Sequence, residues 1–184
     1  MTLSDVDLSR AVSHALRHEP WLYELELDAE GWAPIDQLLD ALREKGGGWE
    51  AVDRDALERM IASGTKRRHE LDGGRIRALY GHSVPGQIRR SPAKPPAQLF
   101  HGTAPVTWAL IEADGLRPMG RQFVHLSVDR DTATMVGRRK SASPLVLVID
   151  AIAAEAAGTR FYEGNELVWL ADGAVPARFI SQTE

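Results

Sequence analysis

Apolar side chains recur at helical spacing in the first third of the chain and in short extended runs further on. Three amphipathic helices are predicted near the N-terminus, with apolar stripes formed by Leu8, Val12, Ala15 and Leu16, by Leu38, Leu39 and Leu42, and by Leu57, Met60 and Ile61. Pro20 ends the first helix near His18, Pro34 and Asp36 open the second, and Asp53 can cap the third. The helical periodicity stops after the third stripe, so the chain changes its structure there.

A β-hairpin is predicted next, because two short extended runs, 68–71 and 75–80, flank the turn residues Asp72-Gly73-Gly74. Gly31-Trp32-Ala33 is a further short extended piece. Three helices followed by a hairpin is the winged-helix pattern, which usually binds nucleic acid, although fold alone assigns no function. Arg75 and Arg77 share one face of the return strand, which suits phosphate contacts or simply keeps an exposed wing soluble.

The second half of the chain is richer in strands. They are predicted at 99–101, 123–127, 144–149, 161–162, 167–170 and 177–180, with helices at 106–113, 131–137 and 150–157. The expected architecture is an α+β lobe with a mostly antiparallel, split sheet. No G-x-G-x-x-G follows a first strand, which argues against a Rossmann lobe.

A Pro-rich segment separates the two halves. Residues 85–98, PGQIRRSPAKPPAQ, contain four prolines and almost nothing apolar, so they can form neither a helix nor a central strand. The sequence therefore predicts a lobe at 1–84, a linker at 85–98 and a second lobe at 99–184.

Composition and charge narrow the function classes. Of the 184 residues, 43% are hydrophobic and 26% charged, as in ordinary globular proteins. The absence of cysteine excludes disulfides and thiolate metal sites, and neither a signal peptide nor an apolar run long enough for a membrane helix is visible. We therefore expect a cytoplasmic monomer with no membrane partner. The net charge is −4, but basic residues bunch locally, which suits a small anionic target better than a long duplex.

Arg17 and His18 are the first candidates for chemistry, because they lie together at the end of the first helix. The helix dipole favours a protonated histidine there, and arginine grips phosphate with two parallel hydrogen bonds. A surface pair that merely caps the helix is the alternative. His14 and His18 have the i, i+4 spacing of a metal pair, but no third ligand is evident and no metal is expected.

Two further motifs lie in the second lobe. His101-Gly102-Thr103 closes a strand, where glycine lets a ligand approach the backbone and the other two side chains offer hydrogen bonds. Arg121, His125 and Ser127 share one parity in the segment 121–127 and so are expected on one strand face.

Taken together, these residues resemble the KptA family of NAD-dependent RNA 2'-phosphotransferases. The resemblance runs in order over eight segments: 8–18, 28–32, 66–68, 76–83, Phe100-His101-Gly102-Thr103, 121–127, Val136-Gly137 and Val168-Trp169-Leu170. It implies an N-terminal winged-helix lobe, which binds RNA, and a C-terminal ADP-ribosyltransferase-like lobe, which binds NAD.

The resemblance also implies the reaction and the residues that perform it. An internal RNA 2'-phosphate attacks NAD and expels nicotinamide, and the ribose 2''-hydroxyl then attacks the phosphate. The products are 2'-hydroxyl RNA and ADP-ribose 1'',2''-cyclic phosphate. The catalytic set falls on Arg17, His18, Arg68 and Arg121, and the NAD side on His101, Gly102, Thr103, His125 and Ser127.

Two positions depart from the family pattern. His69 stands where an aromatic residue usually follows the wing arginine, and Tyr80 replaces a polar residue, so either ring could stack on a base. Arg138 and Arg139 either contact phosphates or form a solvated face. Two other functions stay open: an ADP-ribosyltransferase acting on nucleic-acid 5'-phosphate ends or on protein, and a non-enzymatic winged-helix regulator with a ligand-sensing lobe.

Overall fold

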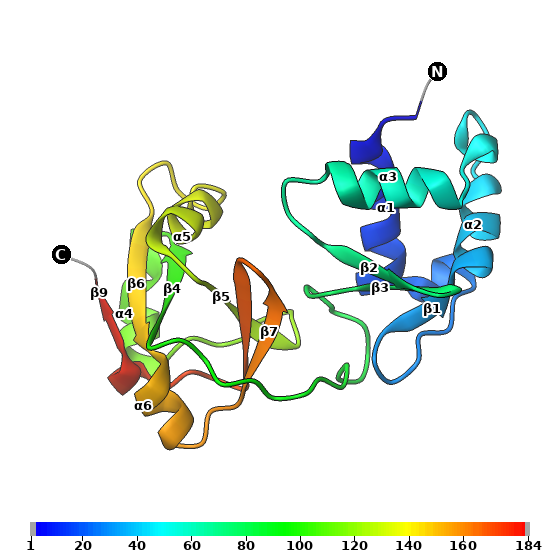
Figure 1. The fold of residues 1–184 in the computed structure, drawn as a ribbon. Helices are drawn as coiled ribbons and strands as arrows, with labels where there is room; N and C mark the ends of the chain where they lie inside the picture. Colours follow the sequence, from blue (N-terminus) through cyan, green and yellow to red (C-terminus); the bar gives the residue numbers. More distant parts are fainter. Residues whose placement is uncertain (1–2, 183–184) are drawn as a thin grey trace. The chain divides into compact units, whose positions relative to one another are not determined.

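The computed structural model describes residues 3–182 and has two units (Figure 1). The contacts divide the chain between Arg89 and Arg90, inside the Pro-rich segment. No helix or strand interrupts residues 79–97, so the prediction for 85–98 is confirmed except at Gln98, which begins β4, and the extended run predicted at 75–80 ends at Ala78. The exact lobe limits at 84 and 99 stay a prediction. Each unit contains one antiparallel sheet with helices packed on it, so the fold is mixed α/β.

The first unit contains α1 (Asp5–Arg17), α2 (Ile35–Arg43) and α3 (Arg54–Ser63), packed on the sheet β1-β3-β2. Its strands are β1 (Trp32–Pro34), β2 (His69–Asp72) and β3 (Arg75–Ala78), and its 3-10 turns are η1 (Pro20–Tyr23) and η2 (Trp49–Ala51). The predicted helices and hairpin are confirmed, and Asp53 caps α3 by accepting from the Ala56 N–H at 2.8 Å. The short extended piece proves to be the third strand of the sheet.

The second unit is built on a six-stranded sheet in the order β7-β8-β5-β4-β6-β9. The strands are β4 (Gln98–Thr103), β5 (Phe123–Ser127), β6 (Leu145–Asp150), β7 (Phe161–Asn165), β8 (Val168–Asp172) and β9 (Ile180–Gln182). The helices are α4 (Trp108–Asp114), α5 (Arg130–Gly137) and α6 (Ala151–Ala156), with 3-10 turns η3 (Pro105–Thr107) and η4 (Ala177–Phe179). Leu99, Leu126, Leu147 and Leu170 are among its buried core residues.

Two local predictions in this unit are wrong. The strand expected at 177–180 is a 3-10 turn in which the Phe179 N–H donates to the Pro176 carbonyl, so β9 starts only at Ile180. Arg121 does not belong to β5, because its N–H closes a turn on the Pro118 carbonyl. Strand parity therefore does not place Arg121 beside His125.

The six-stranded sheet is two three-stranded halves held together at one point. β4 pairs with β6 over six residues, and β5 pairs with β8 over five. Between β4 and β5, however, the register contains only Phe100 opposite Ser127. The two strands diverge beyond that pair, so backbone groups near the divergence, such as the His125 carbonyl, are open to side chains.

Candidate functional site

The C-terminal end of α1 holds Arg17 and His18 in a backbone clamp. The Arg17 carbonyl has no partner within the helix, as is general for the last turn, and it accepts from the Ser83 N–H at 2.8 Å. The exposed His18 ring lies beside the same residue, with its Nδ1 2.8 Å from the Ser83 hydroxyl. The segment that follows the hairpin thus docks on the helix end and orients the histidine.

The guanidinium of Arg17 is half-buried among groups from the hairpin. Its Nη2 donates to the Arg68 carbonyl at 3.4 Å, and its Cζ lies 5.0 Å from the centre of the Tyr80 ring. Gly81 has a φ of +89°, and a Cβ there would come within 3.4 Å of the Arg17 Nη1. Glycine therefore lets the chain turn closely beside the guanidinium.

His69 lies on the inside of this corner, which corrects one expectation. The residue is 2% exposed and its Nε2 is 3.0 Å from the Ser13 hydroxyl, so the ring cannot stack on a base. Burial first, and then the positive charges of Arg17, Arg68 and His82, lower the pKa of His69 to about 3. The same cations that disfavour a proton on His69 favour an anion outside the corner.

His14 contacts a carboxylate and a tyrosine hydroxyl. Its Nε2 is 2.8 Å from a Glu19 carboxylate oxygen, and its Nδ1 is 3.3 Å from the Tyr23 hydroxyl. Among residues 3–182, no group of three or more His, Cys, Asp or Glu side chains is arranged to hold a metal ion. Within the same range, no helix has both the length and the apolar character needed to cross a membrane.

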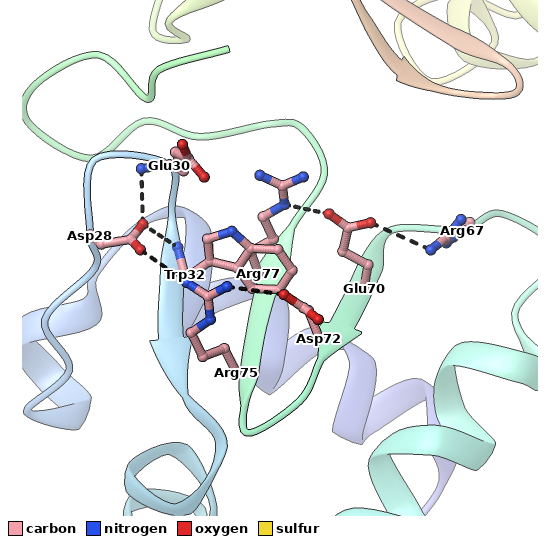
Figure 2. Close-up of polar contacts among 8 residues, drawn as sticks. All are labelled: Asp28, Glu30, Trp32, Arg67, Glu70, Asp72, Arg75 and Arg77. Atoms are coloured by element: carbon pink, nitrogen blue, oxygen red, sulfur yellow. Dashed lines mark hydrogen bonds and ion pairs between the residues drawn. The ribbon is translucent and has the colours of Figure 1, made fainter. Parts of the chain in front are cut away.

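The hairpin arginines share one face of the sheet, but carboxylates accompany them (Figure 2). In register across the strands lie Trp32, Arg77 and Glu70, followed by Pro34, Arg75 and Asp72. Arg77 pairs with Glu70, and Arg75 lies 3.0 Å from Asp72 and 3.8 Å from Asp28. Both guanidinium groups also rest on the Trp32 ring, 4.9 and 4.4 Å from its centre. The charges on this face are therefore locally neutralised.

In the second unit, the His101 side chain on β4 contacts β5 near the point where the two strands diverge. Its Nδ1 lies 2.9 Å from the His125 carbonyl oxygen, which can only accept, so this nitrogen carries the proton. Burial lowers the pKa of His101, opposed by the hydrogen bond to His125 and reinforced by the charges of Lys140 and Arg121. A neutral ring with its proton on Nδ1 leaves Nε2 as a hydrogen-bond acceptor.

Arg121 reaches the His125 ring from the turn before β5. Its Nη1 contacts the His125 Nδ1. A guanidinium can only donate, so the His125 Nδ1 must accept and the proton of a neutral ring lies on Nε2. The expected pairing of these side chains is therefore found, although the turn rather than strand alternation creates it.

Gly102 and Thr103 have structural partners. A Cβ on Gly102 would lie 1.8 Å from the Ala133 carbonyl oxygen, so the absence of a side chain lets α5 pack on β4. The approach of a helix thus accounts for this glycine without a ligand. The buried Thr103 hydroxyl is 2.8 Å from that of Thr107. Ser127 is 6% exposed and faces Phe100 and Val168 in the sheet register.

In the first unit, the Arg17 guanidinium contacts the Arg68 backbone and the His18 ring contacts Ser83. In the second unit, the structure brings His101, His125 and Arg121 together. Sequence reasoning assigned no role to Ser83 or Ser13, whose side chains contact His18 and His69. The Gly-His-Ser segment was a visible signal for Ser83, whereas nothing local marks Ser13. Arg138 and Arg139 are exposed at the end of α5.

Known proteins resemble this chain over nearly its whole length. A model of the family "RNA 2'-phosphotransferase, Tpt1 / KptA family" matches residues 3–173. A protein of Acetivibrio thermocellus is 49% identical over 173 residues, which cover 94% of each chain. Proteins of Bacillus thuringiensis subsp. konkukian and Pseudomonas paraeruginosa are 49% and 45% identical, with 94% or more of each chain covered. All three are named "Probable RNA 2'-phosphotransferase".

Proposed function

Since the chain belongs to the RNA 2'-phosphotransferase, Tpt1 / KptA family, and is thus a transferase, we propose that it transfers an internal RNA 2'-phosphate to NAD-derived ADP-ribose. The observation that carries this proposal is the cationic corner at the end of α1. There Arg17 contacts the Arg68 carbonyl, His18 contacts Ser83, and the charges of Arg17 and Arg68 act on His69. Arginine stays protonated and forks onto phosphate oxygens, so such a corner suits a phosphate that must be held without a metal.

In this proposal the first unit is the RNA side, with a winged-helix architecture. Three helices on a three-stranded antiparallel sheet, with β2 and β3 as its hairpin, support that assignment. Arg17 and Arg68 grip the 2'-phosphate. His18 donates a proton to the departing RNA 2'-oxygen, and Ser83, which contacts its Nδ1, orients the ring.

The second unit is proposed as the NAD side, with an ADP-ribosyltransferase-like split sheet. The single residue pair between β4 and β5 supports the split. His101 fits a nucleotide ribose, because its neutral ring offers Nε2 as an acceptor for a hydroxyl. Thr103, His125 and Ser127 complete the proposed NAD contacts around the divergence, and Gly102 serves them by admitting α5.

The proposed reaction balances without a metal. A 2'-phosphate oxygen of RNA bonds to the anomeric carbon of the nicotinamide ribose while the bond to nicotinamide breaks. The ribose 2''-hydroxyl then loses its proton as its oxygen bonds to phosphorus, the bond to the RNA 2'-oxygen breaks, and that oxygen takes a proton from His18. ADP-ribose 1'',2''-cyclic phosphate and nicotinamide leave. Arg17 and Arg68 stabilise the charge that develops on the phosphate oxygens in the second step, and the family resemblance assigns Arg121, which contacts His125, to the same step.

The test uses an RNA oligonucleotide with one internal 2'-phosphate, incubated with and without NAD. We expect loss of the phosphate and release of nicotinamide only when NAD is present. Arg68→Ala and Arg121→Ala should slow the second step and build up an RNA-2'-phospho-ADP-ribose adduct.

Arg67→Ala and Arg117→Ala are the matched controls, because these exposed arginines pair with Glu70 and Asp114. Both should process the oligonucleotide as the wild type does. Absence of NAD-dependent dephosphorylation by the wild type would refute the proposal. Modification of an RNA 5'-phosphate or of protein in its place would favour another ADP-ribosyltransfer.

A further inference from the structure

A hollow of about 380 Å³ opens on the first unit beside the cationic corner. Its wall is largely apolar and includes Pro20, Trp21, Leu27, Pro85 and Ile88. Trp21 is 54% exposed, which is unusual for so large an apolar ring. None of the residues assigned to the reaction lines this hollow.

Backbone hydrogen bonds hold the two sides of the hollow. At one end the Ser83 N–H donates to the Arg17 carbonyl at 2.8 Å, and at the other the Arg89 N–H donates to the Ala29 carbonyl at 2.7 Å. Asp28, which also lines the hollow, accepts from the N–H groups of Glu30 and Trp32 (Figure 2). The hollow is therefore a formed feature of the fold and not a gap between loose loops.

The hollow lies one or two residues along the chain from His18, the proposed proton donor, and from Ser83, which orients it. Pro20 follows His18 by two positions, and Val84, which also lines it, follows Ser83 directly. Two residues span at most about 7 Å. Stacked nucleotides on one strand are about 3.4 Å apart, so a nucleotide adjacent to the bound 2'-phosphate can reach the hollow.

The chemistry of the wall favours a base over a second phosphate. The Asp28 carboxylate is part of the lining and would repel an anion. An exposed indole with apolar neighbours instead offers a stacking surface for a flat, uncharged ring, which is how proteins commonly take bases of unpaired RNA.

We propose that this hollow binds the base of a nucleotide next to the one that carries the 2'-phosphate, with the base stacked on Trp21. The inference rests on the proposed function, because it takes Arg17, His18 and Arg68 as the phosphate site. It adds a contact that recognises an unpaired neighbouring nucleotide, so the enzyme would discriminate against a mononucleotide 2'-phosphate.

The experiment combines three variants with three substrates. The variants are Trp21→Ala, Trp21→Phe and Leu22→Ala, the last being a control from the same turn that is 64% exposed and does not line the hollow. The substrates are an oligonucleotide with an internal 2'-phosphate and two copies of it that lack the base on the 5' or on the 3' neighbour.

We expect Trp21→Ala to raise KM for the intact substrate about tenfold with kcat little changed, and Trp21→Phe to raise it less. On one abasic substrate the wild type should show the same raised KM, and Trp21→Ala should then add nothing. Leu22→Ala should stay within twofold of the wild type throughout.

If Trp21→Ala raises KM equally for all three substrates, or raises it for none, the proposed base contact is wrong. Fluorescence anisotropy of the labelled oligonucleotides without NAD measures their binding. It separates a failure of the base contact from a failure of the proposed function. If the wild type turns over no substrate, the proposed reaction is refuted. If Trp21→Ala nevertheless binds the intact oligonucleotide more weakly than the wild type does, and the abasic ones equally well, the base site is retained.

Discussion

Arg17 is positioned by neighbours that come from distant parts of its unit. The Tyr80 ring packs under its guanidinium, the Arg68 carbonyl accepts from its Nη2, and Gly81 passes beside it. Held in this way, the planar group loses little further freedom when it binds two oxygens of one phosphate. A lysine at this position would keep the charge but could not form a fork.

Arg17→Lys should therefore lower kcat/KM for the 2'-phosphorylated oligonucleotide by at least about tenfold, which corresponds to about 1.4 kcal/mol of transition-state stabilisation. Steady-state turnover measures this effect. Arg10→Lys is the control, because Arg10 is exposed and pairs with Asp7 on the surface. Equal activity of Arg17→Lys and the wild type would show that charge alone suffices.

His69 makes folding depend on pH. Its pKa is about 3 in the folded protein and near 6.5 when unfolded, so between these values only the unfolded chain binds the proton. The free energy of unfolding therefore has its full value, as far as His69 is concerned, above pH 6.5, and it decreases as the pH falls toward 3. At pH 5 the loss amounts to about 2 kcal/mol.

His69→Gln removes this titration and can keep a hydrogen bond to Ser13. Urea unfolding at pH 7.5 and pH 5.0 should show that the wild type loses about 2 kcal/mol more than the variant on acidification. Equal losses in the two proteins would mean that His69 already takes up a proton in the folded state at pH 5.

At the scale of elements, one close approach decides how the second unit packs. α5 lies on β4 at Gly102, where a Cβ would come within 1.8 Å of a backbone oxygen. Backbone cannot move aside as a side chain does, so a methyl group there must displace the helix.

Gly102→Ala should lower the free energy of unfolding by about 3 kcal/mol or more, or leave the protein unable to fold. Gly120→Ala in the same unit is the matched control, because a Cβ at Gly120 meets no atom within 4 Å. Its effect should stay within about 0.5 kcal/mol. Thermal and urea unfolding measure both, and a mild effect of Gly102→Ala would contradict the packing.

The hairpin face contributes structure more than phosphate binding. Arg75 is surrounded by Asp28, Asp72 and the Trp32 ring, so its charge is already compensated. Arg75→Gln should change KM for the RNA by less than twofold and the free energy of unfolding by less than about 1 kcal/mol, as is usual for half-exposed ion pairs. A tenfold rise in KM would instead identify the hairpin as a phosphate contact.

At the scale of the whole molecule, acidic residues outnumber basic ones, and only a few of the basic residues are proposed to bind RNA. The net charge is −4, with 22 basic and 26 acidic residues. Such a protein has little general affinity for a polyanion, and its RNA contact should stay local.

The salt dependence of binding tests this. With the three cations proposed in the first unit, Arg17, His18 and Arg68, engaged, a plot of log affinity for single-stranded RNA against log salt concentration should have a slope of about −2. A 2'-phosphorylated oligonucleotide titrated at several salt concentrations gives this slope. A much steeper slope would reveal an extended basic surface.

The sequence by itself determined the helices, their caps and the hairpin. Apolar stripes, Asp53 before α3 and the glycine turn act within a few residues, so a local pattern suffices to specify them. The order of motifs along the chain likewise sufficed to identify the family.

Only the tertiary structure decided what several candidate residues do. His69 is buried against Ser13, Gly102 admits α5, and Arg75 rests on the Trp32 ring, each through a neighbour more than 25 residues away in the sequence. No local period encodes such a contact. Burial and charge at a side chain depend on which distant segments the fold brings to it, and these set its pKa, its freedom to bind a ligand and hence its role.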